Sequence, residues 1–235
     1  MLPVMLVIFF AIFVQGLVGF GLALIAMPLL AALIGIGEAA PAVALLGFTA
    51  EIALVWRYRR DLNVRTVGRL VVAAALGIPL GLLALRGLDE QLVLTVLGLV
   101  IVGYAGYALL NLRVPALSHP AWGYGLGFLA GVLGGAYNTS GPPVIIYGHC
   151  RRWSPEEFKG NLQGFFVAVS LFIAAGHLLA GNVTGEVWRI YLLGLAPMAL
   201  ALWLGPHLAT HVNPFVFRRL VLLLLLVLGI SLILG

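Results

Sequence analysis

The residues best suited to bind a ligand lie in one polar run inside an otherwise apolar sequence, GGAYNTSGPPVIIY at 134–147. The glycines predict the end of one helix, and the two prolines predict the first turn of the next, where a missing N–H group costs no hydrogen bond. Thr139 or Ser140 is placed to cap this second helix with its side-chain oxygen. A helix start with N–H groups and neutral hydroxyl and amide donors attracts a small anion. The predicted binding residues of this run are Gly134, Gly135, Tyr137, Asn138, Thr139, Ser140 and Gly141.

A similar break occurs near the beginning of the chain, in QGLVGFGLALIAMP at 15–28. Here Gln15 supplies a polar side chain, while Gly19 and Gly21 supply backbone freedom. A second interpretation stays open for the glycines of both breaks, because small residues at this spacing also let helices pack closely. It applies to Gly16, Gly19, Gly131 and Gly134. We expect Gln15, Gly19 and Gly21 to be the first-half counterpart of the polar run. The two breaks should meet near the middle of the membrane, where transporters place their substrate.

Three further polar residues lie within or beside apolar stretches. Glu51 is a carboxylate inside a membrane-length segment, and such a group is functional by default, with proton coupling as its commonest role. The alternative is that Glu51 reaches the interface and pairs with an arginine such as Arg57. Asn161 and Gln163 open another apolar segment, where they either line a cavity beside the second break or cap the helix.

The composition defines the elements that must position these residues. The chain of 235 residues is 63% hydrophobic and 9% charged, whereas a soluble domain has about 25% charged residues. We therefore predict an all-α, multi-pass protein of the cytoplasmic membrane. Two long apolar segments, 1–34 and 122–150, contain the breaks. The other segments approach the roughly 20 residues that cross a bilayer, and they are 40–56, 68–85, 92–112, 161–180, 187–204 and 215–234.

The sequence also repeats itself, with residues 1–112 as the first repeat and 121–235 as the second. At a constant offset of 115 residues (128 − 13), the matching pairs are Phe13 and Phe128, Gly16 and Gly131, Gly19 and Gly134, and Pro28 and Pro143. Later pairs, after short insertions, are Gly47 and Gly164, Gly77 and Gly194, and Pro79 and Pro197. This collinear series predicts a duplication of four membrane-embedded segments.

Equivalent loops of the two repeats have opposite charge, which is typical of inverted-topology repeats. The loop at 57–65 holds four arginines, and its counterpart at 181–186 holds none. Conversely, 35–39 carries only an acidic residue, while its counterpart at 151–159 is basic. If 1–34 and 122–150 are re-entrant hairpins, every loop obeys the rule that cytoplasmic loops are rich in Lys and Arg. The alternative is eight plain spans, with the rule broken in one half.

Charge and cysteine content exclude other classes of protein. The net charge is +5, but the arginines lie at segment ends, where they anchor helices in the lipid bilayer, so we expect no nucleic-acid partner. The single cysteine, Cys150, excludes an internal disulfide and a cysteine-based metal cage. We expect a small anionic substrate, no cofactor and no metal. Whether the chain forms a homo-oligomer stays open.

The two breaks also carry a family resemblance. GLVGFGLALIAMPLL at 16–30, repeated as GVLGGAYNTSGPPVII at 131–146, resembles the sulfite exporter TauE/SafE family of membrane permeases over essentially the whole chain. This chain has Leu22, Ala23 and Leu24 where the family typically has more glycine. The resemblance implies a secondary transporter, a permease or exporter, that moves a sulfur oxyanion or organosulfonate such as sulfite, thiosulfate or sulfoacetate by alternating access.

Two other functions stay open at this point. A passive anion channel needs no alternation between two states. An intramembrane hydrolase would use Ser140 as nucleophile and His149 or His177 as base, and this pair must lie within hydrogen-bond distance. His149 follows Ser140 by nine residues, about 13 Å along one helix. We therefore expect a transporter and not an enzyme.

Overall fold

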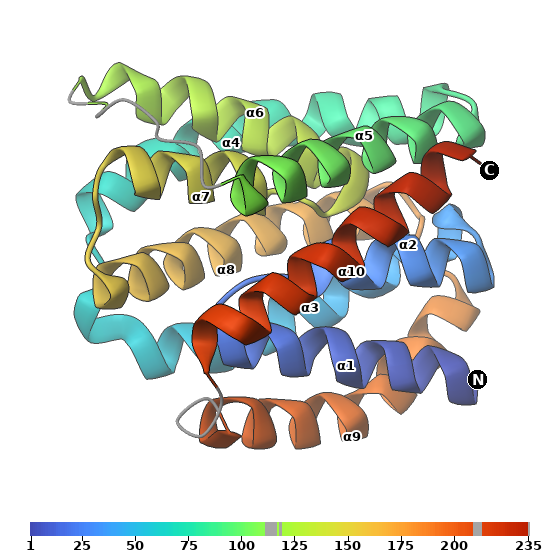
Figure 1. The fold of residues 1–235 in the computed structure, drawn as a ribbon. Helices are drawn as coiled ribbons and strands as arrows, with labels where there is room; N and C mark the ends of the chain where they lie inside the picture. The colour runs from blue at the N-terminus through green and yellow to red at the C-terminus, as the bar shows by residue number, and fades with distance from the viewer. Residues whose placement is uncertain (111–116, 118, 209–212, 235) are drawn as a thin grey trace. The chain divides into compact units, whose positions relative to one another are not determined.

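A computed structural model describes residues 1–110, 117, 119–208 and 213–234 of the chain (Figure 1). The described residues form α-helices and one short 3-10 helix, with no strand among them. The all-α prediction is therefore confirmed. In chain order the elements are α1 (Leu2–Val18), α2 (Leu22–Ile34), α3 (Ile36–Tyr58), η1 (Arg59–Asp61), α4 (Val64–Gly87), α5 (Glu90–Leu109), α6 (Ala121–Tyr137), α7 (Gly141–Cys150), α8 (Pro155–Leu179), α9 (Gly185–Leu208) and α10 (Pro214–Leu234).

Helix length separates two classes of element. In the described part of the chain, six helices are long and apolar enough to cross a membrane, namely α3, α4, α5, α8, α9 and α10, and each covers all or most of one predicted span. The predicted long segments are instead each divided in two. α1 and α2 have 17 and 13 residues, and α6 and α7 have 17 and 10, all below the roughly 20 residues of a full span.

The helices group into two compact units. Unit 1 comprises Met1–Leu46, Leu88–Leu112 and Val183–Gly235, and unit 2 comprises Gly47–Gly87 and Arg113–Asn182. Unit 1 therefore contains α1, α2, the beginning of α3, α5, α9 and α10, and unit 2 contains the rest of α3 with η1, α4, α6, α7 and α8. Each unit draws helices from both halves of the sequence, and the repeat boundaries at 112 and 121 stay a prediction.

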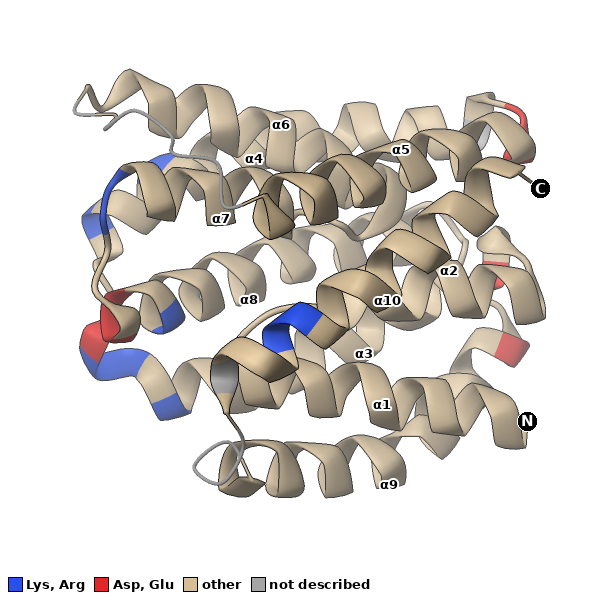
Figure 2. Ribbon diagram, viewed as in Figure 1, with Lys and Arg blue, Asp and Glu red and all other residues tan. Residues whose placement is uncertain are grey.

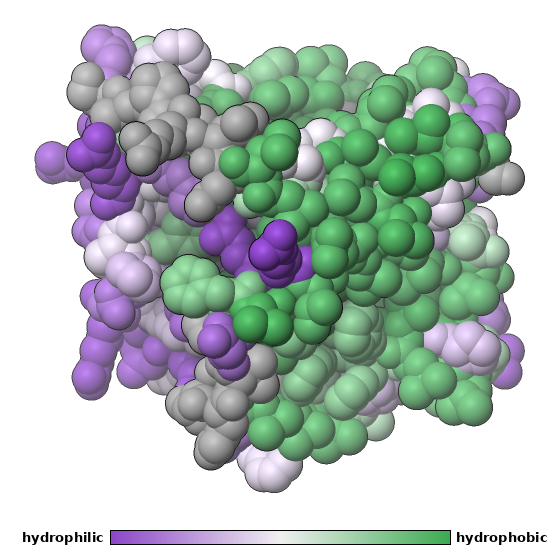
Figure 3. Space-filling view, in the orientation of Figure 1, coloured by the Kyte–Doolittle hydropathy of each residue, from purple (hydrophilic) through white to green (hydrophobic). Residues whose placement is uncertain are grey.

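Glycines set the helix packing within unit 1. α1 packs against α2 and α9, while α10 packs along α5 (Figure 1). A Cβ atom on Gly16 of α1 would lie 3.2 Å from Cδ of Pro206 in α9. On α5, a Cβ atom on Gly98 would lie 2.6 Å from the carbonyl oxygen of Gly229 in α10. The outer side chains of α10, such as Val227, form an apolar surface suited to lipid (Figure 3).

In unit 2, α6 lies directly on the backbone of α4. Glycines recur every four residues along both helices, at 77 and 81 in α4 and at 127, 131 and 135 in α6. A Cβ atom on Gly131 would overlap the backbone of Ala74, and one on Gly81 would overlap the backbone of Val132. The packing interpretation of Gly131 is therefore confirmed, because this close approach requires a residue without a side chain.

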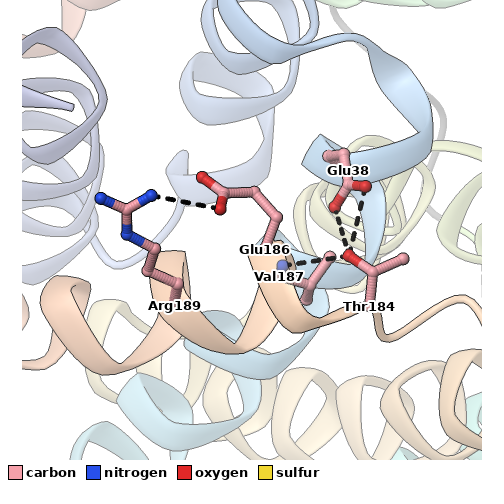
Figure 4. A network of polar contacts seen from close by, with 5 residues as sticks. All are labelled: Glu38, Thr184, Glu186, Val187 and Arg189. Atoms are coloured by element: carbon pink, nitrogen blue, oxygen red, sulfur yellow. Dashed lines mark hydrogen bonds and ion pairs between the residues drawn. The ribbon is translucent and has the colours of Figure 1, made fainter.

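A polar cluster lies at one end of unit 1, where Figure 4 shows the contacts between the beginnings of α3 and α9. The Thr184 hydroxyl donates to the carboxylate of Glu38, at 2.8 and 3.2 Å, and accepts a 3.2 Å bond from the N–H of Val187. The Ile36 N–H donates to the Glu90 carboxylate at 3.2 Å. The links before α3, α5 and α9 therefore lie close together. All four acidic residues of unit 1 belong to this end, and they are Glu38, Asp89, Glu90 and Glu186.

Basic residues outnumber acidic residues at one end of unit 2, around η1 and the α7–α8 turn, where Figure 2 shows both kinds. The Asn63 N–H, just before α4, donates to Oδ1 of Asn161 in α8 at 2.7 Å. The Arg151 guanidinium donates to the carbonyl of Leu117 at 3.0 Å, and the Leu117 N–H donates to the carbonyl of Cys150 at 3.2 Å. The chain thus enters α6 and leaves α7 at the same end, so these two helices form a hairpin.

Candidate functional site

The polar run forms a sharp break between α6 and α7, as predicted, but the predicted helix end at Gly134 and Gly135 was wrong, because α6 continues through both glycines to Tyr137. Asn138 ends α6 in the left-handed conformation, with φ 55° and ψ 8°, and its N–H donates to the Gly134 carbonyl at 2.7 Å. Asparagine tolerates this conformation better than most residues with a side chain. Asn138, and not Gly141, is therefore the residue with positive φ here. α7 begins three residues later, with Pro142 in its first turn.

The expected cap is absent, so this part of the prediction was wrong. Ser140 occupies the N-cap position of α7, but its side chain makes no capping bond, and the Thr139 hydroxyl donates instead to the Tyr137 carbonyl at 3.0 Å. A cap bonds the N–H of the second or third helical residue. In α7 these residues are Pro142 and Pro143, which have no N–H group. The prolines thus leave the Ser140 hydroxyl without a capping role.

The break is buried among apolar side chains of α8. Thr139 is 1% exposed and Ser140 is 5% exposed. A Cβ atom on Gly141 would lie 3.5 Å from the Phe166 ring, and one on Gly134 would lie 3.1 Å from Cδ1 of Ile173. The two glycines let α8 and the break approach closely. The result is a small group of neutral polar atoms enclosed by hydrophobic walls.

Gly135 and Tyr137 have different surroundings. A Cβ atom on Gly135 would overlap the carbonyl of Ile78, so this glycine faces α4 as part of the helix packing. Tyr137 is buried at the end of α6, and its carbonyl accepts the Thr139 bond. The polar atoms of the break therefore come from Tyr137 to Ser140.

The remaining polar candidates of unit 2 are buried in α8 and α3. Gln163 is fully buried and lies one turn before Phe166, so it shares a face of α8 with the wall of the break. Asn161 is 1% exposed, and its Oδ1 atom holds the Asn63 N–H. Glu51 is 6% exposed on α3, where Gly47, one turn earlier, leaves space beside its carboxylate. Substrate binding by Asn161 and Gln163 and proton coupling by Glu51 stay predictions.

The first break, in unit 1, has another construction. Gly19 and Gly21 both have positive φ, 88° and 117°, and α2 begins directly after them. The Oε1 atom of Gln15 accepts a 3.1 Å hydrogen bond from the Leu22 N–H, the first amide of α2. Gln15 is 2% exposed, so its bond to Leu22 connects the end of α1 to the start of α2 within the protein interior. The structure brings the three predicted residues of this break together.

The sequence reasoning did not identify Tyr104 of α5. Tyr104 is 3% exposed, and its ring contacts the ring of Phe20 edge to face, with 6.1 Å between centroids. Phe20 lies between the two glycines of the first break. A tyrosine in the middle of an apolar span is a signal that could have drawn attention, because its hydroxyl needs a polar partner at membrane depth.

Nothing described in the structure assembles a hydrolytic site around Ser140. The His149 ring stacks on Phe158 near the end of α7, with 5.3 Å between centroids. The Nδ1 atom of His177 lies 3.0 Å from Nδ2 of Asn182, at the far end of α8. Among the described residues, no group of three or more His, Cys, Asp or Glu side chains is arranged to hold a metal ion.

Comparisons with known proteins agree with this architecture. The family model described as sulfite exporter TauE/SafE matches residues 4–232. The chain is also 28% identical over 175 residues to a probable inner membrane transporter protein, TsaS, of Comamonas testosteroni, and the match covers 74% of this chain and 73% of that protein. No solved structure gives a significant match.

Proposed function

Because the chain belongs to the sulfite exporter TauE/SafE family of membrane proteins, we propose that it is a secondary permease for a small anion. The substrate class is a sulfur oxyanion or an organosulfonate, moved across the cytoplasmic membrane by alternating access. The observation that carries this proposal is the α6–α7 break. It holds buried hydroxyl groups at Thr139 and Ser140, and the double proline leaves Ser140 with no capping bond to make.

Neutral donors suit such a substrate. A sulfur oxyanion presents several acceptor oxygens, and hydrogen bonds from hydroxyl and amide groups to a charged acceptor are stronger than those between neutral groups. A buried cation would hold the anion more firmly. A transporter must also release its substrate, which favours binding of moderate strength. The Ser140 hydroxyl supplies a donor, and the start of α7 supplies the positive end of a helix dipole without a full charge.

The arrangement of the helices supports the duplication of four segments. In unit 2, α6 of the second repeat packs on α4 of the first, and in unit 1, α1 of the first repeat packs on α9 of the second. α1 corresponds to α6, and α9 corresponds to α4. Each hairpin thus packs on the same helix of the other repeat, as expected for repeats related by a two-fold axis.

The charges and the hairpins support a topology with six spans. α6 begins and α7 ends at the basic end of unit 2. α1 runs from the N-terminus, and α2 returns toward the same end of unit 1, where α3 begins (Figure 1). The connection between α2 and α3 at this end carries the acidic residue Glu38. With the basic end in the cytoplasm, as the positive-inside rule requires, the second hairpin enters from the cytoplasm and the first from the opposite side.

The test of the proposed function is counterflow in proteoliposomes. The purified protein should accumulate labelled substrate when unlabelled substrate is on the other side, with sulfite, thiosulfate, sulfonates and carboxylates as the panel. A passive channel gives no such accumulation. If no sulfur oxyanion or sulfonate in the panel is transported, the substrate class is wrong.

A pair of variants of equal size tests the position of the site. Ser140→Asp places a carboxylate in the break and should abolish transport, because it repels the substrate and occupies the helix start. Ser140→Asn has the same shape without the charge and should retain part of the activity. A hydrogen bond to a charged group contributes about 1.5–3 kcal/mol, so Ser140→Ala should weaken binding by about tenfold to a hundredfold. Equal activity of the Asp and Asn variants would place the anion elsewhere.

A further inference from the structure

The first break contains an amide whose orientation is fixed. The Oε1 atom of Gln15 accepts the hydrogen bond of the Leu22 N–H at 3.1 Å. A flipped amide would turn its own N–H groups toward this donor, so the structure permits one orientation only. The Nε2 atom of Gln15 therefore faces away from the start of α2 and presents its N–H groups as donors.

These donors have no partner in the described part of the chain. The Nε2 atom of Gln15 is inaccessible to solvent and makes no hydrogen bond with any residue that the structure describes. A buried donor without a partner is costly, and native proteins retain few of them. The first break thus has an unused, buried hydrogen-bond donor beside a helix start.

A second unused group borders the same break. The Tyr104 hydroxyl is buried and also lacks a hydrogen-bond partner among the described residues. Its ring contacts Phe20, which lies within the break, two residues before Leu22. Gln15 and Tyr104 come from α1 and α5, and both belong to unit 1. Two independent side chains therefore leave polar groups unsatisfied at one interruption of the backbone.

The surroundings of this break favour a negatively charged ligand. All four carboxylates of unit 1 belong to the polar end formed by the links before α3, α5 and α9. On α5, Glu90 precedes Tyr104 by 14 residues, about 21 Å along the helix. No acidic side chain on α1 or α2 competes for the two donors.

We propose that Nε2 of Gln15 and the hydroxyl of Tyr104 form an oxyanion-binding site at the α1–α2 break. This inference rests on the proposed transport of a sulfur oxyanion and adds Tyr104 as a residue that recognises it. The Nε2 atom of the fixed Gln15 amide can only donate hydrogen bonds, so the site selects a ligand whose oxygens accept them. A sulfur oxyanion meets this requirement with several oxygens at once.

Two conservative variants isolate the donors. Tyr104→Phe removes only the hydroxyl and retains the ring that contacts Phe20. Gln15→Glu retains an oxygen for the Leu22 N–H and replaces the free donor by an acceptor. Tyr124→Phe is the control, since this tyrosine of α6 is 49% exposed.

The experiment measures binding of thiosulfate and of sulfite to the purified protein, together with its melting temperature. Tyr104→Phe should raise the dissociation constant about tenfold to a hundredfold, as expected for a lost bond to a charged acceptor. Its melting temperature should not fall, because the hydroxyl has no hydrogen-bond partner among the residues that the structure describes. Gln15→Glu should abolish binding, and Tyr124→Phe should change neither quantity.

The outcomes separate this site from the function on which it rests. If the parent protein binds thiosulfate or sulfite and both Tyr104→Phe and Gln15→Glu bind as well as the parent, the site is wrong and the proposed function stands. If Tyr104→Phe lowers the melting temperature and leaves binding unchanged, the hydroxyl has a structural role, which also overturns the site. If the parent binds neither anion, the proposed function fails first and the site fails with it.

Discussion

The two breaks reverse the chain in different ways. At the first break, two glycines with positive φ make the turn, and the Gln15 side chain satisfies the first amide of α2. At the second break, Asn138 alone has positive φ, and two prolines remove the amides that would need a cap. Backbone donors at membrane depth must be satisfied within the protein. At the first break Gln15 accepts the Leu22 N–H, and at the second break Pro142 and Pro143 replace the residues whose N–H groups would need a cap.

This difference decides which polar groups remain for a ligand. At the first break, the Oε1 atom of Gln15 accepts the Leu22 N–H, and its Nε2 atom remains available to donate to a ligand. At the second, no side chain is needed as a cap, so the Ser140 hydroxyl remains. The two breaks are equivalent in sequence position and differ in which atoms they offer.

The largest expected difference between the hairpins lies in how they pack. Gly131→Ala would force a Cβ atom into the backbone of Ala74, whereas Gly16→Ala would meet Cδ of Pro206 at 3.2 Å, where small shifts suffice. Overpacking a tight contact costs about 1–3 kcal/mol and sometimes more. We expect Gly131→Ala to lower stability by about 3 kcal/mol or more and Gly16→Ala by about 1 kcal/mol or less. Unfolding in detergent measures both, and equal losses would contradict the tighter packing of α6.

The turn residues should give an intermediate effect. Gly21 has φ 117°, a value that residues with a side chain rarely adopt, so Gly21→Ala should lower the free energy of unfolding by about 1–3 kcal/mol. Asn138 has φ 55°, so Asn138→Gly should have little effect on this free energy. The same unfolding assay compares the two variants. A large loss from Asn138→Gly would show that the asparagine side chain itself maintains the second break.

The smallest effect should come from restoring one amide at the second break. Pro143→Ala returns an N–H group that the Ser140 hydroxyl can cap, and a cap contributes about 1 kcal/mol. The hydroxyl would then be less available, so substrate binding should weaken by about fivefold. The control is the same substitution in a Ser140→Ala background, where it should have no effect on binding. Equal weakening in both backgrounds would show that Pro143 acts by another route.

Much of this fold could be predicted because hydropathy and helix breakers are local signals. The six spans follow from the lengths of the apolar segments, and the second break follows from the polar run and its two prolines, although the glycines gave the wrong end for α6. The missing cap was predictable too, since the positions of Pro142 and Pro143 exclude its donors. The prediction that Ser140 caps α7 overlooked that these two prolines have no N–H group for the cap to bind.

Other features depend on which helices meet, which a single sequence does not encode locally. Tyr104 and Phe20 are 84 residues apart, and only the packing of α5 near the first break brings their rings together. The bond between Asn161 and the Asn63 backbone likewise joins distant segments. The close approach of Gly131 to α4 required knowing that α6 packs on α4.

The proposed topology places the entrances of the two hairpins on opposite sides of the membrane. Single cysteines in a Cys150→Ser background test this claim at Gly37, His119 and Glu156, which are all exposed. Position 37 follows the first hairpin, and 119 and 156 flank the second. The account predicts that a membrane-impermeant maleimide labels position 37 in intact cells and labels 119 and 156 only after permeabilisation. Labelling of 119 and 156 from different sides, or of 37 from the same side as both, would contradict it.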